Sequence, residues 1–266
     1  MIHWRLTSQQ FEAAFFAMRR DRLPYPIRNT VRAENEADLG QRRRTAIDTL
    51  LPRLDDDFAR LMHTLADPQV RVHMHGRGGD DPADHGTRSR GYAGFGPSIA
   101  AVAIQDQDEE PGVSGEITVS LCSPHQAFVL LAGTLPEQRQ GRHRLTGLKS
   151  ELDIEPDWVG GWNRPPTLRE RIEAFFSRSR TEWGEVLCYP GPFLDNRTDG
   201  VEGFFWMDFP GDGRYYVRAD STSYTVTPMG SDQFVEYLRA LAWRVRELGT
   251  KPAAVRPGTA VTGIPS

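Results

Sequence analysis

The chain has 266 residues, of which 38% are hydrophobic and 10% aromatic, so it can bury a substantial core and lacks the composition of a disordered protein. No apolar run approaches the roughly 20 residues that a membrane-spanning helix requires, which argues against membrane insertion. The formal net charge of -4 argues against nucleic acid as a partner, since proteins that bind it usually present a basic face.

The N-terminus and the cysteine content favour a cytoplasmic protein. The opening residues contain no basic segment followed by an apolar one, so no secretory signal is expected. Cys122 and Cys188 are the two cysteines, too few for a disulfide framework or a cysteine-rich zinc motif. The tight cluster Arg42–Arg44 follows the acidic residues Glu34, Glu36 and Asp38 and does not make a basic domain.

The first half of the chain begins with helices and continues into strands. Phe11, Phe15 and Met18 recur at helical spacing, whereas Val70, Val72 and Met74 alternate as in a strand. Residues 76–91 are rich in glycine and charge, which predicts a long exposed loop. The expected elements are a strand at 2–6, helices at 8–20, 38–51 and 55–66, strands at 69–75, 98–105 and 115–121, and a helix at 124–135.

The second half contains the strongest local pattern, a β-hairpin. The aromatic run Phe204–Phe209 is interrupted by Pro210–Gly213, and a second aromatic and β-branched run, Arg214–Arg218, follows. The pattern of strand, tight turn and strand is clear. The other expected elements are a helix capped by Thr167, a strand at 185–189, a strand at 224–227 and a helix at 230–245.

The order of elements is similar in the two halves, which predicts an architectural duplication with both halves in one sheet. We expect a single domain over residues 1–248. Its N-terminal half covers about 1–144, a connector about 145–166, and its C-terminal half about 167–248. The remaining residues 249–266, rich in Pro, Ala, Gly and Thr, predict a disordered tail.

His73 and His75 are the best candidates for metal ligands, because an H-x-H pair on a strand directs both imidazoles to one face. Asp80, Asp81, Asp84 and His85 follow, and the resulting hypothesis is a metal-dependent hydrolase. The spacing does not fit: Asp84 and His85 lie across a Gly-rich loop, and no later ligands complete the shell. The favoured interpretation is two solvent-facing strand histidines, with no metal and no cofactor.

Other candidates for catalysis are weak, and no enzyme activity is expected. The sequence has no nucleophile elbow, phosphate-binding loop or dinucleotide fingerprint. Cys122 lies beside His125, but positions so close rarely let a nucleophile and its base face each other, so a structural cysteine is favoured. Asp208 and Asp212 are interpreted as a strand-end residue and a turn former.

The sequence resembles the EspG family, cytosolic chaperones of type VII secretion systems in actinobacteria. The similarity rests on LTSQQFEAAFFAM with LPYPI, LMHTLADPQVRVHMHG, CSPHQAFVLLAGTLP, and above all FFWMDFPGDGRYYVRADSTSYTVTPM. The resemblance implies an α+β fold with a central, largely antiparallel sheet, pseudo-two-fold halves, and N-terminal and C-terminal helical bundles. It also implies binding of the apolar tip of a PPE protein in a PE-PPE heterodimer, without catalysis.

The resemblance places the partner surface between the sheet and the C-terminal helices, with help from the first long loop. The residues that it suggests for partner binding are Tyr92, Phe95, Phe204, Trp206, Tyr216, Phe234 and Tyr237. One face of the aromatic hairpin is expected to close the core and the other to line the groove. Two alternatives to the chaperone stay open: the hydrolase built on His73 and His75, and a self-associating scaffold that pairs as a homodimer.

Overall fold

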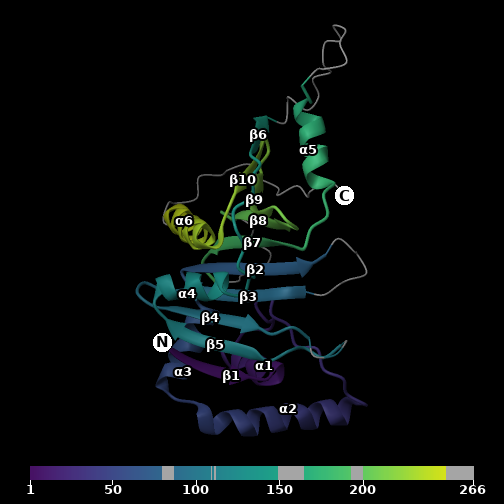
Figure 1. Ribbon diagram of the computed structural model, residues 1–266. Coiled ribbons are helices and arrows are strands. Elements are labelled where there is room, and N and C mark those ends of the chain that lie inside the picture. The colour runs from purple at the N-terminus through teal and green to yellow at the C-terminus, as the bar shows by residue number, and fades with distance from the viewer. Residues whose placement is uncertain (80–86, 109, 111, 149–164, 193–199, 250–266) are drawn as a thin grey trace.

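The computed structural model describes residues 1–79, 87–108, 110, 112–148, 165–192 and 200–249. Its strands form one ten-stranded sheet in the order β1-β5-β4-β3-β2-β7-β8-β9-β10-β6, and all neighbouring pairs are antiparallel (Figure 1). The strands are β1 (Ile2–Leu6), β2 (Val70–Gly78), β3 (Thr87–Phe95), β4 (Ala100–Gln105), β5 (Ile117–Cys122), β6 (Leu145–Leu148), β7 (Glu182–Pro190), β8 (Glu202–Phe209), β9 (Gly213–Ala219) and β10 (Ser223–Pro228).

The helices begin where the sequence provides a capping side chain. Thr7, Ser123 and Thr167 each accept a hydrogen bond from a backbone N–H of the first turn and form capping boxes, while Asn35 and Asp55 cap through their side-chain oxygens. The helices are α1 (Ser8–Ala17), α2 (Glu36–Leu50), the 3-10 turn η1 (Leu51–Arg53), α3 (Asp56–Ala66), α4 (Pro124–Ala132), α5 (Leu168–Phe176) and α6 (Ser231–Gly249). No described helix is both long and apolar enough to cross a membrane.

The sheet contains two four-stranded meanders that meet at its centre. Strands β2, β3, β4 and β5 lie in chain order and lead into α4, and strands β7, β8, β9 and β10 do the same and lead into α6. The two meanders are joined by the antiparallel pairing of β2 with β7. The α+β fold and antiparallel sheet are therefore confirmed, whereas the structural equivalence of the two halves stays a prediction.

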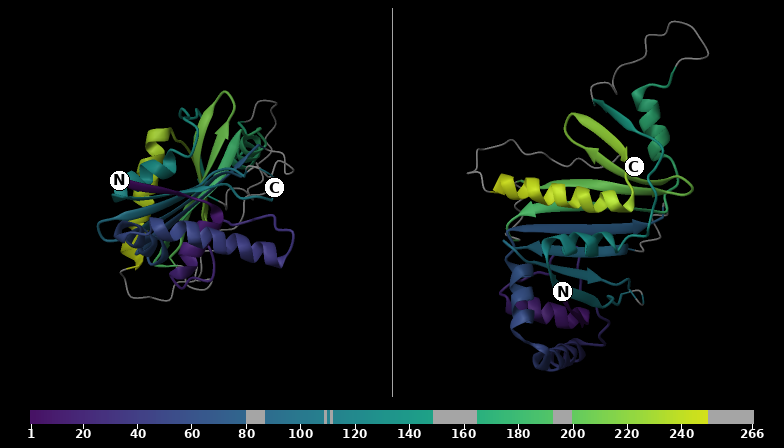
Figure 2. Two further views of the ribbon diagram at one scale, coloured as in Figure 1. Left: turned by 90° about the horizontal axis from the view of Figure 1, so that it is seen from below. Right: turned by 60° about the vertical axis from the view of Figure 1, so that its left-hand side comes forward.

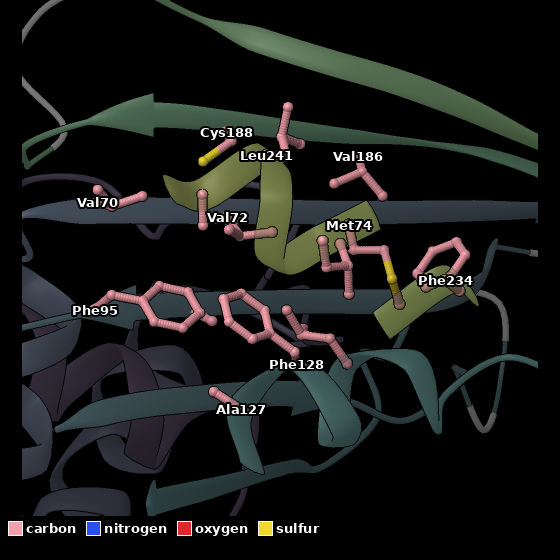
Figure 3. Close-up of a cluster of buried hydrophobic side chains, with 14 of the residues drawn as sticks. Val70, Val72, Met74, Phe95, Ala127, Phe128, Val186, Cys188, Phe234 and Leu241 are labelled. Atoms are coloured by element: carbon pink, nitrogen blue, oxygen red, sulfur yellow. The ribbon is translucent and has the colours of Figure 1, made fainter. Parts of the chain in front are cut away.

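Helices cover both faces of the sheet. On one face, α4 and α6 pack over β2, β3, β7 and β8, where Val72, Met74, Phe128, Phe234 and Leu241 share one buried cluster (Figure 3). On the opposite face, α1 and α3 close the core of the N-terminal half, and α5 contributes to a separate core in the C-terminal half. The two views in Figure 2 show α2 as the outermost helix at the N-terminal end, where it packs on α1.

Strand β3 corrects the predicted loop at 76–91. Strand β2 extends to Gly78 and β3 starts at Thr87, so much of that segment is sheet, while 80–86 lie outside the described residues. Two glycines of β3, Gly91 within the predicted loop and Gly94 just after it, allow helices to approach the sheet closely. A Cβ on Gly94 would lie 2.2 Å from the carbonyl oxygen of Thr64 in α3, and one on Gly91 would lie 2.7 Å from a methyl of Leu131 in α4.

The connector predicted at 145–166 begins with strand β6, which pairs with β10 and forms one edge of the sheet. The rest of the connector, apart from residues 165 and 166, lies outside the described residues. Of the tail expected at 249–266, Gly249 ends helix α6, and residues 250–266 lie outside the described residues.

Candidate functional site

Helix α6 covers only part of the C-terminal half of the sheet. Phe234, Leu238, Leu241 and Val245 form its fully buried stripe, and the helix contacts β2, β7 and β8. Beyond the helix, the same face of β9 and β10 carries the half-buried residues Arg218, Thr225 and Thr227. This uncovered part of the sheet is the candidate site.

The pairing of β9 with β10 determines which side chains form the candidate site. Tyr216 lies opposite Thr227, and residues directly opposite in an antiparallel pair point to the same side of the sheet. Arg218 likewise lies opposite Thr225. We define the α6–β10 face as these four residues together with three neighbours on β8 and α6: Glu202, Tyr237 and Arg244.

Stacked aromatic rings form the floor of the α6–β10 face next to the helix. The rings of Tyr216 and Tyr237 stack at 4.5 Å between centroids with an interplanar angle of 20°, and the ring of Phe204 lies 5.0 Å from Tyr216. Tyr216 is 9% exposed, and burial raises the pKa of its phenol. Tyr237 is half-buried and reaches the surface from the helix side.

Charged groups border these rings. The Glu202 carboxylate lies 3.2 Å from Nη2 of Arg218 and 3.9 Å from Nε of Arg244, so it links β8, β9 and α6. The three side chains are between 23% and 48% exposed, and solvent therefore weakens both ion pairs. Aromatic faces, threonine hydroxyls and arginine in one place suit a mixed protein interface.

Six of the seven residues suggested for partner binding are buried. Phe95, Phe204, Trp206, Tyr216 and Phe234 belong to the core beneath α4 and α6, because these helices cover the aromatic face of the sheet. Tyr92 lies on the opposite face, where its hydroxyl donates to the carbonyl of Leu65 over 2.8 Å. Their burial favours a supporting role, and direct binding by any of the seven stays a prediction.

Sequence reasoning missed the polar members of the α6–β10 face. Arg218, Thr225 and Thr227 lie in segments predicted as strands, but the predictions considered their aromatic neighbours. The register between β9 and β10 places these three side chains on one face of the sheet. Val217 and Val226 face the opposite core, so residues that alternate with them in each strand point to the α6 side.

The histidines on β2 share one face, as predicted, but His73 is 4% exposed and not solvent-facing. Its ring packs 4.8 Å from Tyr189 and 5.4 Å from Tyr92. Burial lowers the pKa of His73 to about 3 and that of His75 to about 4, so both imidazoles are neutral at pH 7. The Nδ1 atom of His75 lies 2.7 Å from the hydroxyl of Tyr25.

No group of three or more His, Cys, Asp or Glu that could hold a metal ion occurs among the described residues. The additional ligands of the hydrolase hypothesis, Asp80, Asp81, Asp84 and His85, lie outside them. Cys122 is buried, and burial raises the pKa of its thiol to about 11, so the reactive thiolate is scarce at pH 7.

The two hairpin aspartates have separate structural partners. Asp208 is not a simple strand-end residue, because it lies buried against Arg214. Asp212 accepts a hydrogen bond of 2.6 Å from the hydroxyl of Tyr215 and lies 2.5 Å from Nη2 of Arg178. Burial opposes ionisation of Asp212, but hydrogen bonds from Tyr215 and Arg178 outweigh it and lower the pKa.

A continuous antiparallel sheet, with helices on both faces and a mixed aromatic and polar surface beside its last helix, has the features of a protein-binding scaffold. A family model described as the EspG family matches residues 7–240, and the chain therefore belongs to the EspG family. The family resemblance seen in the sequence is confirmed.

A solved structure is similar in fold. It is that of the Mycobacterium tuberculosis type VII secretion system chaperone EspG5 in complex with a PE25-PPE41 dimer. The match has a TM-score of 0.55 and 13% sequence identity, and covers 90% of this chain and 95% of that chain. No curated protein matches this chain.

Proposed function

We propose that the protein is a non-enzymatic cytoplasmic chaperone of type VII secretion. It binds the tip of a PPE protein in a PE-PPE heterodimer, keeps the dimer soluble and delivers it for export. Membership of the EspG family supports this function, and so does the fold shared with a chaperone solved together with a PE-PPE dimer. The observation that carries the proposal to particular residues is the half-buried α6–β10 face.

The α6–β10 face offers each kind of contact that a protein partner requires. The ring of Tyr237 and the underlying Tyr216 provide a rigid aromatic surface for an apolar side chain. Thr225 and Thr227 provide hydroxyl donors and acceptors, and Arg218 provides a guanidinium. When the apolar tip of the partner binds to this face, that tip is no longer exposed to solvent, where it would favour aggregation.

Co-expression with candidate PE-PPE pairs, followed by size exclusion, tests the proposal. We expect a stable 1:1:1 complex with a cognate pair, and we expect Thr225→Arg to abolish it by placing a bulky cation on the face. The matched control is Thr118→Arg, which changes a half-buried threonine on β5, in the other half of the sheet. Failure of every pair to form a complex, or equal loss with both variants, contradicts the proposal.

Self-association through the same face is the competing outcome of that experiment. Light scattering of the protein alone, over a range of concentrations, reports it directly. A dimer that Thr225→Arg dissociates and Thr118→Arg does not would assign the α6–β10 face to a second copy of the chain.

A further inference from the structure

A concave site separate from the α6–β10 face lies in the C-terminal half, on the face of the sheet opposite α6. The cavity has a volume of about 400 Å³, within the range of ligand sites. It lies between α5 and the segment that leads into β6, where Leu145 and Phe175 join one buried cluster. The side chains that define it are Arg142, Arg144, Arg171, Arg178, Leu145 and Phe175.

The cavity concentrates positive charge in a chain whose net charge is -4. It is lined by four arginines, and Arg178 is the one paired with a carboxylate, that of Asp212. The side chains of Arg142, Arg144 and Arg171 form no ion pair with another described residue, and all three residues are exposed. Among the described residues at the cavity, four arginines less the paired aspartate give a formal charge of about +3, which attracts an anion.

Hydrogen bonds hold one wall of the cavity in place. The hydroxyl of Tyr215 accepts from the backbone N–H of Arg142 over 2.8 Å and from that of His143 over 3.1 Å. Asp212 accepts from the same N–H of Arg142 over 3.0 Å. Gly141 allows this contact, because a Cβ there would lie 2.0 Å from the Tyr215 ring. The backbone at Arg142 and His143 is therefore preorganised.

The position of the site beside an edge strand favours an extended chain over a compact anion. The cavity adjoins β6, which is the last strand of the sheet among the described residues and pairs there on one side, with β10. A free strand edge can pair with an extended peptide through backbone hydrogen bonds. Arginine forks match carboxylate geometry, and the floor of Leu145 and Phe175 provides apolar contact between the charged groups.

We propose that this cavity binds an extended acidic peptide segment in which carboxylates alternate with apolar side chains. The carboxylates pair with Arg142, Arg144 and Arg171, and an apolar side chain packs on the floor. This site lies on the opposite face from the α6–β10 face and does not depend on PE-PPE binding.

Fluorescence anisotropy tests the proposal with a labelled nonapeptide of alternating glutamate and leucine. The same peptide with glutamine in place of glutamate is its control. We expect the triple variant R142Q/R144Q/R171Q to bind the acidic peptide about tenfold more weakly, from the loss of three exposed ion pairs. The matched protein control is R42Q/R43Q/R44Q, which removes three clustered arginines from α2 and should change affinity less than about twofold.

Three outcomes would overturn the proposal. They are equal binding of the acidic and glutamine peptides, equal losses in the two triple variants, and displacement of the peptide by inorganic phosphate at the peptide's own dissociation constant. The third would assign the cavity to a small anion. Formation of the PE-PPE complex is measured separately by size exclusion. A negative result in the peptide experiment therefore does not contradict the proposed chaperone function.

Discussion

The guanidinium of Arg214 and the carboxylate of Asp208 form a bidentate ion pair inside the protein. Nε and Nη2 of Arg214 donate to the two carboxylate oxygens over 2.7 Å each, and both side chains are 1% exposed. The residues lie opposite each other on β9 and β8. A further bond of 3.0 Å from Nη2 to the carbonyl of Pro136 connects the hairpin to the segment after α4.

Breaking this pair on one side should strongly destabilise the protein. Asp208→Asn leaves the Arg214 charge buried without its counter-ion, and we expect the free energy of unfolding to fall by about 3–5 kcal/mol in urea denaturation. The control is Glu202→Gln, which removes the carboxylate of a solvent-exposed pair and should cost less than about 1 kcal/mol. Similar losses in the two variants would contradict the interpretation of the buried pair.

The stacked tyrosines should separate stability from partner binding. Tyr216→Ala removes a ring that is 9% exposed, so we expect a loss of about 3 kcal/mol, near the low end for large aromatic side chains. Tyr237→Ala removes a half-buried ring and should weaken PE-PPE binding with a smaller loss of stability. Thermal unfolding and size exclusion measure the two effects. A thermal midpoint unchanged by Tyr216→Ala would show that this ring is not part of the core.

Two glycine substitutions should have opposite signs. At Gly94, a methyl group would meet the backbone of α3 at 2.2 Å, so Gly94→Ala must push the helix from the sheet and should cost about 3 kcal/mol. At Gly40, within α2, a new methyl would lie 3.6 Å from the Arg44 side chain, an ordinary van der Waals contact. Gly40→Ala should stabilise the protein by about 0.5–1 kcal/mol through helix propensity. The denaturant midpoints of both variants measure these changes in stability. An unchanged midpoint for Gly94→Ala would contradict the close packing of α3 on the sheet.

Burial of His73 predicts a dependence of stability on pH. Its pKa falls from 6.5 in the unfolded chain to about 3 in the folded protein, so the unfolded state binds more protons between these values. The contribution of the neutral His73 to the free energy of unfolding is therefore fully present above pH 6.5, and it falls as the pH decreases towards 3. Between pH 7 and pH 5, protonation of this residue in the unfolded state alone should lower the free energy of unfolding by about 2 kcal/mol.

His73→Gln isolates this effect, because it removes the titrating group at the same position. The difference in unfolding free energy between the variant and the parent should change by the same amount over that pH interval. A difference that stays constant from pH 7 to pH 5 would contradict the burial of a neutral His73.

Local patterns predicted most of the elements, and their failures have physical reasons. The run from Phe204, the break at Pro210–Gly213 and the cap at Thr167 depend on neighbours in the chain, and each corresponds to an observed feature. Strand β3 was not predicted because the glycine content of 76–91 indicated a loop, whereas Gly91 packs against Leu131, forty positions away in the chain and on a different element.

The candidate site was harder to predict than the fold. Alternation in the hairpin separates Tyr216 from Val217, but it does not say which face a helix will cover. That depends on α6 packing across β7 and β2, which are distant in the sequence. The aromatic residues are therefore predicted to bind the partner, whereas the half-buried positions that reach solvent are Arg218, Thr225 and Thr227.

The central pairing of β2 with β7 has a consequence for how the molecule can be divided. Each is a nine-residue strand, and each satisfies one row of backbone groups only through the other meander. A fragment ending between the halves would present a long, unpaired inner strand to solvent, with the features of a template for aggregation. Truncated chains cut at the connector are therefore poor substitutes for the intact protein, and a protease that nicks the connector need not separate the two pieces.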